Sequence, residues 1–212
     1  MGKTLSELLE GYDIFRKKYA KHDQSLMKIL GTEGQKPTTL VIACSDSRVD
    51  PAILLQCDPG ELFVVRNVAN ILPPYEKDEY HHGTSAAIEY AVCYLKVKDI
   101  VILGHSDCGG LKALLSDKPL PQDDFITSWV SILDKNKRLS SKPDFAKSAL
   151  LQSYENSLTF PWIKELIDKN KIKIHLWYLD ISNGKINSYD FAKKLFCDIK
   201  ELKDKKPIKA KL

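Results

Sequence analysis

The chain has 212 residues, 43% of them hydrophobic, and a formal net charge of +4. This length predicts one domain over residues 1–212. No apolar stretch is long enough to span a bilayer, and the polar start lacks the apolar core of a secretory signal, which excludes membrane and secreted classes and favours a cytoplasmic protein. The five cysteines form no dense framework, as is typical of a reducing compartment.

Positive charge is concentrated at the C-terminus. Residues 193–212 contain eight lysines and three acidic residues, a segment charge of +5, which leaves the remainder near −1. Basic tails can bind nucleic acid or anionic lipid, but this one has no arginine and no interleaved aromatic residues. We therefore expect a lysine-rich tail that is solvated and frayed, with no nucleic-acid partner.

Strand-like and helical segments alternate along the chain. Residues 5–20 and 26–30 are amphipathic at helical spacing. Four runs rich in Val, Ile and Leu, as buried parallel strands are, lie at 39–43, 62–65, 100–103 and 172–179. Helices are predicted from Asp50-Pro51 to a turn at 57–60, over 85–96 as a buried helix, and over 125–138, 145–158 and 161–170.

A hairpin signal at residues 182–185 follows the last long strand, so residues 186–189 are expected to add an antiparallel edge. The pattern as a whole predicts an α/β fold: an open, mostly parallel sheet of four parallel strands plus this edge strand, flanked by helices and preceded by an N-terminal helical arm.

Metal-ligand residues follow two of the predicted strands. Cys44 comes directly after one apolar run, and His105 and Cys108 follow another. Ligands bind at the carboxyl ends of strands in open α/β sheets, so these side chains can converge on one ion. Two thiolates and one imidazole suit zinc, and three protein ligands leave one position open, as in catalytic sites.

Asp46 and Arg48 lie beside the first of these ligands. They have the same parity along an extended segment, so their side chains can pair. Arginine can hold a carboxylate through two parallel hydrogen bonds, which would keep Asp46 ionised and oriented. Both are predicted to be catalytic.

Long motifs in this chain resemble those of the β class of carbonic anhydrases. They are Ala-Cys-Ser-Asp-Ser-Arg-Val at 43–49, Pro-Gly-Glu-Leu-Phe-Val-Val-Arg-Asn-Val-Ala-Asn at 59–70, Ala-Ala-Ile-Glu-Tyr-Ala at 86–91 and Gly-His-Ser-Asp-Cys-Gly-Gly at 104–110. The similarity extends from about residue 35 to 115 and continues weakly through His175-Leu176-Trp177.

The resemblance implies reversible hydration of carbon dioxide to bicarbonate by a zinc-bound hydroxide. It also implies a homodimer or higher homo-oligomer, in which an arm over residues 1–35 clasps the neighbouring subunit. Similarity to the plant-like branch implies a substrate pocket formed by Gln35, Phe63, Val68, Tyr90 and the backbone amide of Gly109. Apart from the resemblance, His81 and His82 lie in a polar loop where an imidazole could transfer protons near neutral pH; the alternatives are a solvated loop and direct transfer to buffer.

Some members of the class close the site by moving the aspartate that matches Asp46 onto the metal as a fourth ligand. Their bicarbonate pocket has a tryptophan, an arginine and a tyrosine where this chain has Val41, Arg66 and Leu179. Only the arginine is retained, so we expect an open site near neutral pH. Because two thiolates cancel the charge of zinc, activity should rise with pH and inflect above that of three-histidine carbonic anhydrases.

Two alternatives stay open at this point. The same metal set could hydrolyse carbonyl sulfide or carbon disulfide, or Cys44 and Cys108 could form a non-catalytic zinc or thiol sensor. A zinc deaminase is disfavoured because its His-x-Glu and Pro-Cys-x-x-Cys motifs do not occur.

Overall fold

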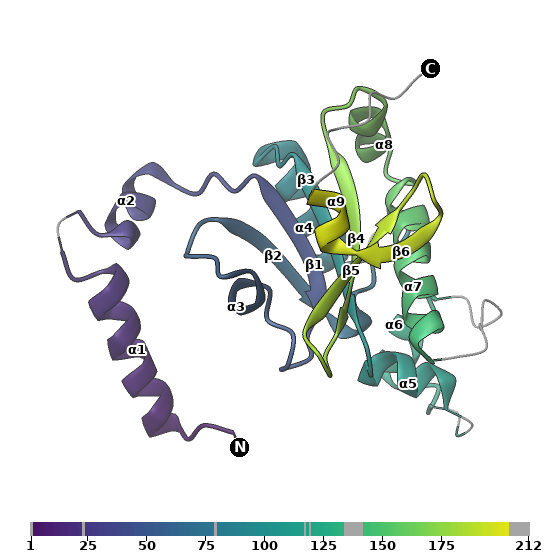
Figure 1. Ribbon diagram of the computed structural model, residues 1–212, viewed down its shortest axis with the longest axis horizontal. Coiled ribbons are helices and arrows are strands. Elements are labelled where there is room, and N and C mark those ends of the chain that lie inside the picture. The colour runs from purple at the N-terminus through teal and green to yellow at the C-terminus, as the bar shows by residue number, and fades with distance from the viewer. Residues whose placement is uncertain are drawn as a thin grey trace.

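A computed structural model describes residues 2–22, 24–78, 80–116, 118, 120–133 and 142–203. Its centre is a six-stranded sheet with the order β2-β1-β3-β4-β5-β6 (Figure 1). The strands are β1 (Thr39–Cys44), β2 (Leu62–Asn67), β3 (Asp99–His105), β4 (Lys173–Asp180), β5 (Lys185–Asp190) and β6 (Leu195–Asp198). The first four are parallel, and β5 and β6 continue the sheet in antiparallel order. The predicted α/β sheet is thus confirmed.

Helices precede the sheet, connect its parallel strands and follow its last strand. They are α1 (Leu5–Tyr19), α2 (Leu26–Glu33), α3 (Pro51–Leu55), α4 (Gly83–Glu89), α5 (Gly109–Leu115), α6 (Phe125–Val130), α7 (Lys142–Ser157), α8 (Pro161–Asp168) and α9 (Ile199–Lys203), with a 3-10 turn η1 (Val68–Asn70) and a π-helical turn η2 (Tyr90–Tyr94). The predicted starts at Pro51 and Pro161 are confirmed, and Asp50 caps α3 by accepting from the amides of Ala52 and Ile53.

Two helical predictions need correction. The segment 85–96 was expected to be buried all round, but only one side of it is, because Tyr90 and Tyr94 are 46% and 70% exposed. Helix α6 ends at Val130 rather than at 138, and residues 134–138 lie outside the described residues.

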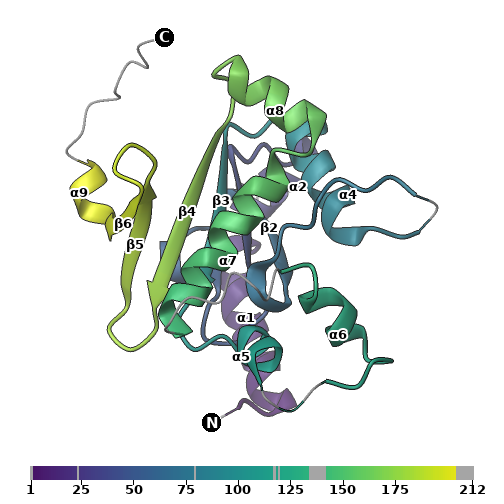
Figure 2. The ribbon, with the colours of Figure 1, turned by 90° about the vertical axis from the view of Figure 1, so that its right-hand side faces the viewer.

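The sheet separates a large core from a small one. Alternate residues of β1 point to opposite faces, so Leu40, Ile42 and Cys44 join the large core under α4, α5, α7 and α8. Val41 and Ala43 face the smaller core, against which Leu54 of α3 packs. Figure 2 shows α7 lying across the helical face of the sheet. Cys44 therefore ends its strand on the side where helices are available to cover it.

A sixth strand was not predicted. Residues 195–198 form β6, which pairs with β5 and places the Tyr189 and Phe196 rings 5.1 Å apart. Such cross-strand aromatic pairs stabilise a short edge strand. The expected fraying of residues 193–212 therefore does not begin at 193, since β6 and α9 occupy 195–203; residues 204–212 lie outside the described residues.

Helices α1 and α2 project from one side of the sheet in Figure 1. Helix α1 buries no residue, and its apolar side chains are exposed, including Leu5 at 74% and Leu9 at 58%. Lys18 and Tyr19 hydrogen-bond to Asp58 in the turn before β2. In the described part of the chain, no helix has the length and apolar character needed to cross a membrane.

The packing between α7 and β3 gives a stability prediction. Leu150 is fully buried, and its side chain lies over Gly104, where an added Cβ would be 3.1 Å from it. Leu150→Ala should lower the free energy of unfolding by about 2–5 kcal/mol, because the rigid sheet cannot collapse into the cavity. Urea unfolding measures this change. Leu195→Ala, at a side chain that is 46% exposed, is the control, and an equal loss in both variants would contradict the predicted packing.

Candidate metal centre

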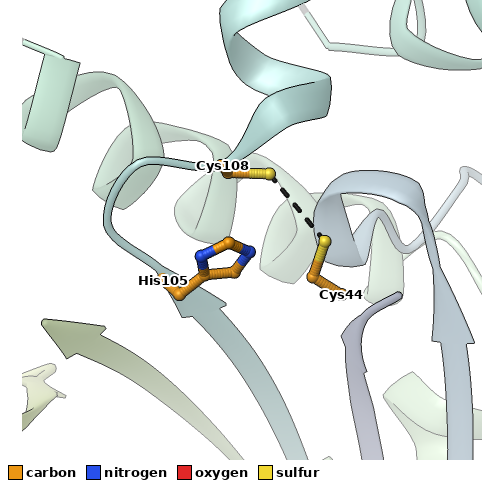
Figure 3. Close-up of side chains that lie close together, drawn as sticks. All are labelled: Cys44, His105 and Cys108. Atoms are coloured by element: carbon orange, nitrogen blue, oxygen red, sulfur yellow. Dashed lines mark hydrogen bonds between the residues drawn. The ribbon is translucent and has the colours of Figure 1, made fainter. Parts of the chain in front are cut away.

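Two adjacent parallel strands bring the predicted ligands together. β1 ends at Cys44 and its neighbour β3 ends at His105, and the pairing of Ala43 with Leu103 places both ends at one edge of the sheet. Cys108 follows at the N-terminal cap of α5. The ligand atoms of all three residues lie within 4.8 Å of one another, and the two sulfur atoms are 3.9 Å apart (Figure 3). All three side chains are buried.

The imidazole of His105 is oriented for metal binding. Its Nδ1 lies 2.8 Å from the Ser106 carbonyl oxygen, to which it donates, so Nε2 keeps its lone pair. Nε2 is buried and makes no hydrogen bond to any described residue. A buried acceptor without a partner is costly unless something binds it. A metal ion bound by Nε2 and the two sulfur atoms would remove that cost. The three side chains therefore fit a metal ion.

Ser106 fixes this orientation through the neighbouring strand. Its backbone amide donates to the Leu179 carbonyl at 2.8 Å, and its hydroxyl accepts from the Ile181 amide at 2.9 Å. Both contacts reach the end of β4. The loop that carries His105 is therefore tied to the sheet on the side away from Cys44.

The two thiols have opposite pKa shifts because they are so close. The pKa of Cys44 is lowered, first by the hydrogen bond from Cys108 and further by His105 and the amides of Asp46 and Ala69, which outweigh burial. The pKa of Cys108 is raised, because a second thiolate would face the first and because the site is buried. The backbone amides of Leu111 and Gly110 at the start of α5 lower this pKa, but the other causes outweigh them.

Asp46 and Arg48 pair beside the thiols as the sequence predicted. Arg48 donates from Nε to Oδ1 at 2.9 Å and from a terminal nitrogen to Oδ2 at 2.7 Å, and its backbone amide donates to Oδ1 at 3.0 Å. These bonds to Arg48 hold the pKa of Asp46 well below its usual range. Asp46 Oδ2 lies 4.0 Å from His105 Nε2, so an ionised carboxylate faces the metal position.

Arg66 holds the loop that carries Asp46. It donates to the carbonyls of Cys44 at 3.0 Å, Asp46 at 2.8 Å and Val49 at 3.1 Å, and it pairs with the Asp50 carboxylate at 3.0 Å. The sequence pointed to this arginine only as a remnant of a bicarbonate pocket. Its four contacts instead hold the backbone of residues 44–50 in place.

Asp107 is a second partner of Arg48 that the sequence did not single out. Arg48 approaches its carboxylate at 3.5 Å and its backbone carbonyl at 3.3 Å, and Lys112 pairs with the same carboxylate. Asp107 has a left-handed backbone (φ 60°), which turns the chain between His105 and Cys108. In the sequence, the only sign that Asp107 belongs to the site was its position between His105 and Cys108.

The predicted substrate residues divide into two groups. Val68 begins η1 directly after β2 and packs against Gly110, next to Gly109 at the start of α5. Both Val68 and Gly109 therefore lie beside the metal ligands. Phe63 pairs with Leu40 near the start of β1, roughly four residues or 13 Å along the sheet from Cys44.

Tyr90 and Gln35 belong to the second group. The Tyr90 ring lies 6.0 Å from the Phe63 ring and stacks on Tyr94 at 5.6 Å. Gln35 is exposed and precedes β1, at the end of the sheet opposite Cys44 (Figure 1). The structure does not bring Phe63, Tyr90 or Gln35 to the metal ligands of their own chain.

The other residues considered from the sequence have local roles in the structure. Val41 and Leu179 are buried in the small core, with at most 4% exposure. His82 pairs with Asp78 at 2.6 Å in an exposed loop. A cavity of about 250 Å³ lies beside Cys108, and none of the predicted substrate residues lines it.

Comparison with known proteins gives the family of the chain. The family model described as carbonic anhydrase matches residues 39–186. The chain belongs to the carbonic anhydrase family. It is 34% identical over 207 residues to a carbonic anhydrase of Pseudomonas aeruginosa, covering 93% of each chain.

Solved structures identify the β class. The chain is similar to the β-carbonic anhydrase CcaA, with a TM-score of 0.78 and 33% identity over 92% of this chain and 98% of that one. It is also similar to a structure from a study of two tetrameric β-carbonic anhydrases of Sordaria macrospora, with a TM-score of 0.72 and 31% identity over 86% and 95% of the two chains. The resemblance inferred from the motifs is confirmed.

The thiol pKa shifts predict how many protons the cluster would release on binding zinc. At pH 7 the lowered pKa of Cys44 favours its thiolate, whereas the raised pKa of Cys108 keeps that thiol protonated. Zinc binds cysteine as thiolate, so binding should release about one proton, which comes from Cys108.

Calorimetric titration with zinc at pH 7, in buffers of different ionisation enthalpy, measures this release. Cys44→Ser should weaken binding strongly, while Cys93→Ser, at an exposed thiol outside the cluster, should not change it. Equal zinc affinity in the two variants would contradict the proposed ligand set.

Proposed function

We propose that this chain catalyses the reversible hydration of carbon dioxide to bicarbonate and a proton, with zinc held by Cys44, His105 and Cys108. The observation that carries the proposal is the buried cluster of these three side chains, with an unpartnered His105 Nε2, in a member of the carbonic anhydrase family. Two sulfur ligands and one nitrogen ligand suit zinc, and the fourth position is left for a non-protein ligand.

When bound, zinc would acidify a water molecule and so supply a nucleophile near neutral pH. The residues of the chain then position that nucleophile. Asp46 is kept ionised by Arg48, so it accepts a hydrogen bond from the attacking oxygen and directs a lone pair at the substrate carbon. Arg66 keeps the Asp46 backbone in place, and the amide of Gly109 donates to a substrate oxygen.

We propose that the site is open near neutral pH. Three hydrogen bonds hold Asp46 on Arg48, and leaving them to bind the metal would break a charge-assisted bidentate pair. Val41 and Leu179 fill the small core and offer no polar group to hold bicarbonate against the loop. The donors of Arg66 are already engaged by residues 44–50.

The substrate pocket is proposed to be shared between two subunits. Within one chain Val68 and Gly109 lie beside the ligands, whereas the partly buried Phe63 and the exposed Tyr90 form a separate ring pair. Helix α1 presents its apolar side chains to solvent, a face of the kind that is covered in an oligomer. The similar tetrameric β-carbonic anhydrases of Sordaria macrospora support a homodimer or larger assembly.

Stopped-flow measurement of carbon dioxide hydration tests the activity. The zinc-loaded protein should acidify an indicator buffer rapidly, and Cys44→Ser should lose this activity because a metal ligand is removed. Cys93→Ser is the matched control, since its thiol is exposed and outside the cluster. Zinc binding without turnover would favour a sensor, and turnover of carbonyl sulfide but not carbon dioxide would favour a hydrolase.

The pH dependence follows from the charges around the metal. Activity should rise with pH and inflect above the value of three-histidine carbonic anhydrases, because two thiolates cancel the metal charge and leave the bound water less acidic. Asp46 does not set this inflection, because its lowered pKa keeps it ionised throughout the range. Measuring kcat/KM between pH 6 and 9 checks the prediction, and a flat profile would contradict it.

Subunit mixing tests the shared pocket. Cys44→Ser and Gln35→Ala should each lose activity alone, but mixed dimers would combine intact ligands from one subunit with an intact Gln35 from the other. After random re-pairing, about a quarter of wild-type activity should return, because half of the dimers are mixed and each has one complete site. If Gln35 served its own chain, every site in a mixed dimer would be defective and mixing would restore nothing.

A further inference from the structure

The turn η1 has a backbone that its residues do not favour by themselves. Ala69 and Asn70 both have left-handed backbones, with φ of 65° and 47°, although neither is glycine. Side chains with a Cβ adopt this region at a cost, so such conformations persist only where the surroundings impose them. Ala69 and Asn70 are also buried, at 1% and 3% exposure.

This turn touches the metal centre at two points. The turn packs against β1, and the backbone amide of Ala69 is close enough to the Cys44 thiol to help lower its pKa. The Val68 side chain lies over the start of α5, where a Cβ added to Gly110 would be 2.5 Å from Val68 Cγ1. A small movement of η1 would therefore change both the environment of a ligand sulfur and the wall beside Gly109.

The turn η1 is held by one side chain next to it in the sequence and by another that is distant in the sequence. The Asn67 side chain closes the turn locally, accepting from the Ile71 amide and donating to the Ile71 carbonyl, both at 2.8 Å. The restraint from outside is Trp129, whose indole Nε1 donates to the Val68 carbonyl at 2.8 Å across 61 residues of sequence. Because an indole nitrogen can only donate, this bond requires the Val68 carbonyl to face α6.

Helix α6, which contains Trp129, packs close to the turn that Trp129 holds. It packs against α5, which in turn packs against η1, so the three elements form one unit beside the metal ligands. Figure 2 shows α5 and α6 near one end of the sheet and α8 near the other. Trp129 is partly buried and also packs against the large core, which fixes its ring.

We infer that Trp129 is a positioning residue of the metal centre: its indole N–H holds η1 so that the Ala69 amide meets the Cys44 sulfur and Val68 stays over Gly110. It acts through the turn and touches neither metal nor substrate. The catalytic part of this inference rests on the proposed function, whereas the effect on the sulfur ligand does not.

The variant Trp129→Phe tests the inference, because it removes the donor and keeps most of the ring. Trp162→Phe is the matched control, on α8 and in ring contact with Phe160 away from the ligands. Each protein is loaded with cobalt(II) for spectroscopy and with zinc for kinetics. If η1 moves, its amides stabilise the Cys44 thiolate less and the sulfur becomes a stronger electron donor, so the sulfur-to-cobalt charge-transfer band of Trp129→Phe should move to longer wavelength.

In the zinc enzyme, Trp129→Phe should keep full metal content but lose about three- to tenfold in kcat/KM, the effect expected from one neutral hydrogen bond. Trp162→Phe should change neither the band nor kcat/KM. If Trp129→Phe only lowers the melting temperature and matches the control in both readouts, the residue is merely structural and the inference is overturned.

A second variant covers the case in which Trp129→Phe does not fold. Trp129→Tyr retains more of the ring volume, and its hydroxyl lies at the end of the ring rather than at the position of Nε1, so the same band shift is expected. A wild-type protein that does not hydrate carbon dioxide would refute the proposed function, while the cobalt band would still decide the role of Trp129.

Discussion

The pairing of β1 with β3 is the constraint on which the metal centre depends. Parallel strands end at the same edge of a sheet, so the register that pairs Ala43 with Leu103 also brings Cys44 beside His105, 61 positions later in the chain. Cys108 completes the set because a left-handed Asp107 turns the chain into α5 after three residues. A shift of one residue in β1 would move Cys44 to the opposite face and separate the ligands.

Around this pairing, two arginines organise the loop after β1. Arg66 binds three backbone carbonyls and Asp50, which determines where residues 44–50 lie, while Arg48 binds the carboxylate of Asp46. Guanidinium groups suit both tasks because they remain charged and present several donors in a fixed plane. The backbone is thereby fixed first, and the ionised carboxylate is oriented on it beside the metal position.

Apolar side chains are exposed on α1 and on the α4–η2 segment of the described chain. Helix α1 has no buried residue, and Tyr90 and Tyr94 stack on the outside of the α4–η2 segment. Surfaces of this kind commonly mark contacts between subunits. The separation of Phe63 and Tyr90 from the metal ligands of their own chain fits the same arrangement, because a second copy can supply what the strand geometry keeps apart.

Sequence alone determined the properties that depend on neighbouring residues. The continuous apolar runs predicted the parallel strands, Pro51 and Pro161 marked helix starts, and the motifs around Cys44 and His105 pointed to the residues that cluster and to the family. The same local patterns did not reveal β6, because four residues beside two lysines carry too little alternation, and the strand depends on contacts such as Phe196 against Tyr189.

Tertiary structure decided the relations between distant segments. The contacts of Arg66 with residues 44–50, the bond from Trp129 to Val68, and the distance of Phe63 and Gln35 from Cys44 all follow from the sheet order and helix packing. Periodicity reports which side of one element is buried, but it does not specify which element covers that side. The chemistry of the ligands was therefore readable from the sequence, and the residues that position them became visible only in the folded chain.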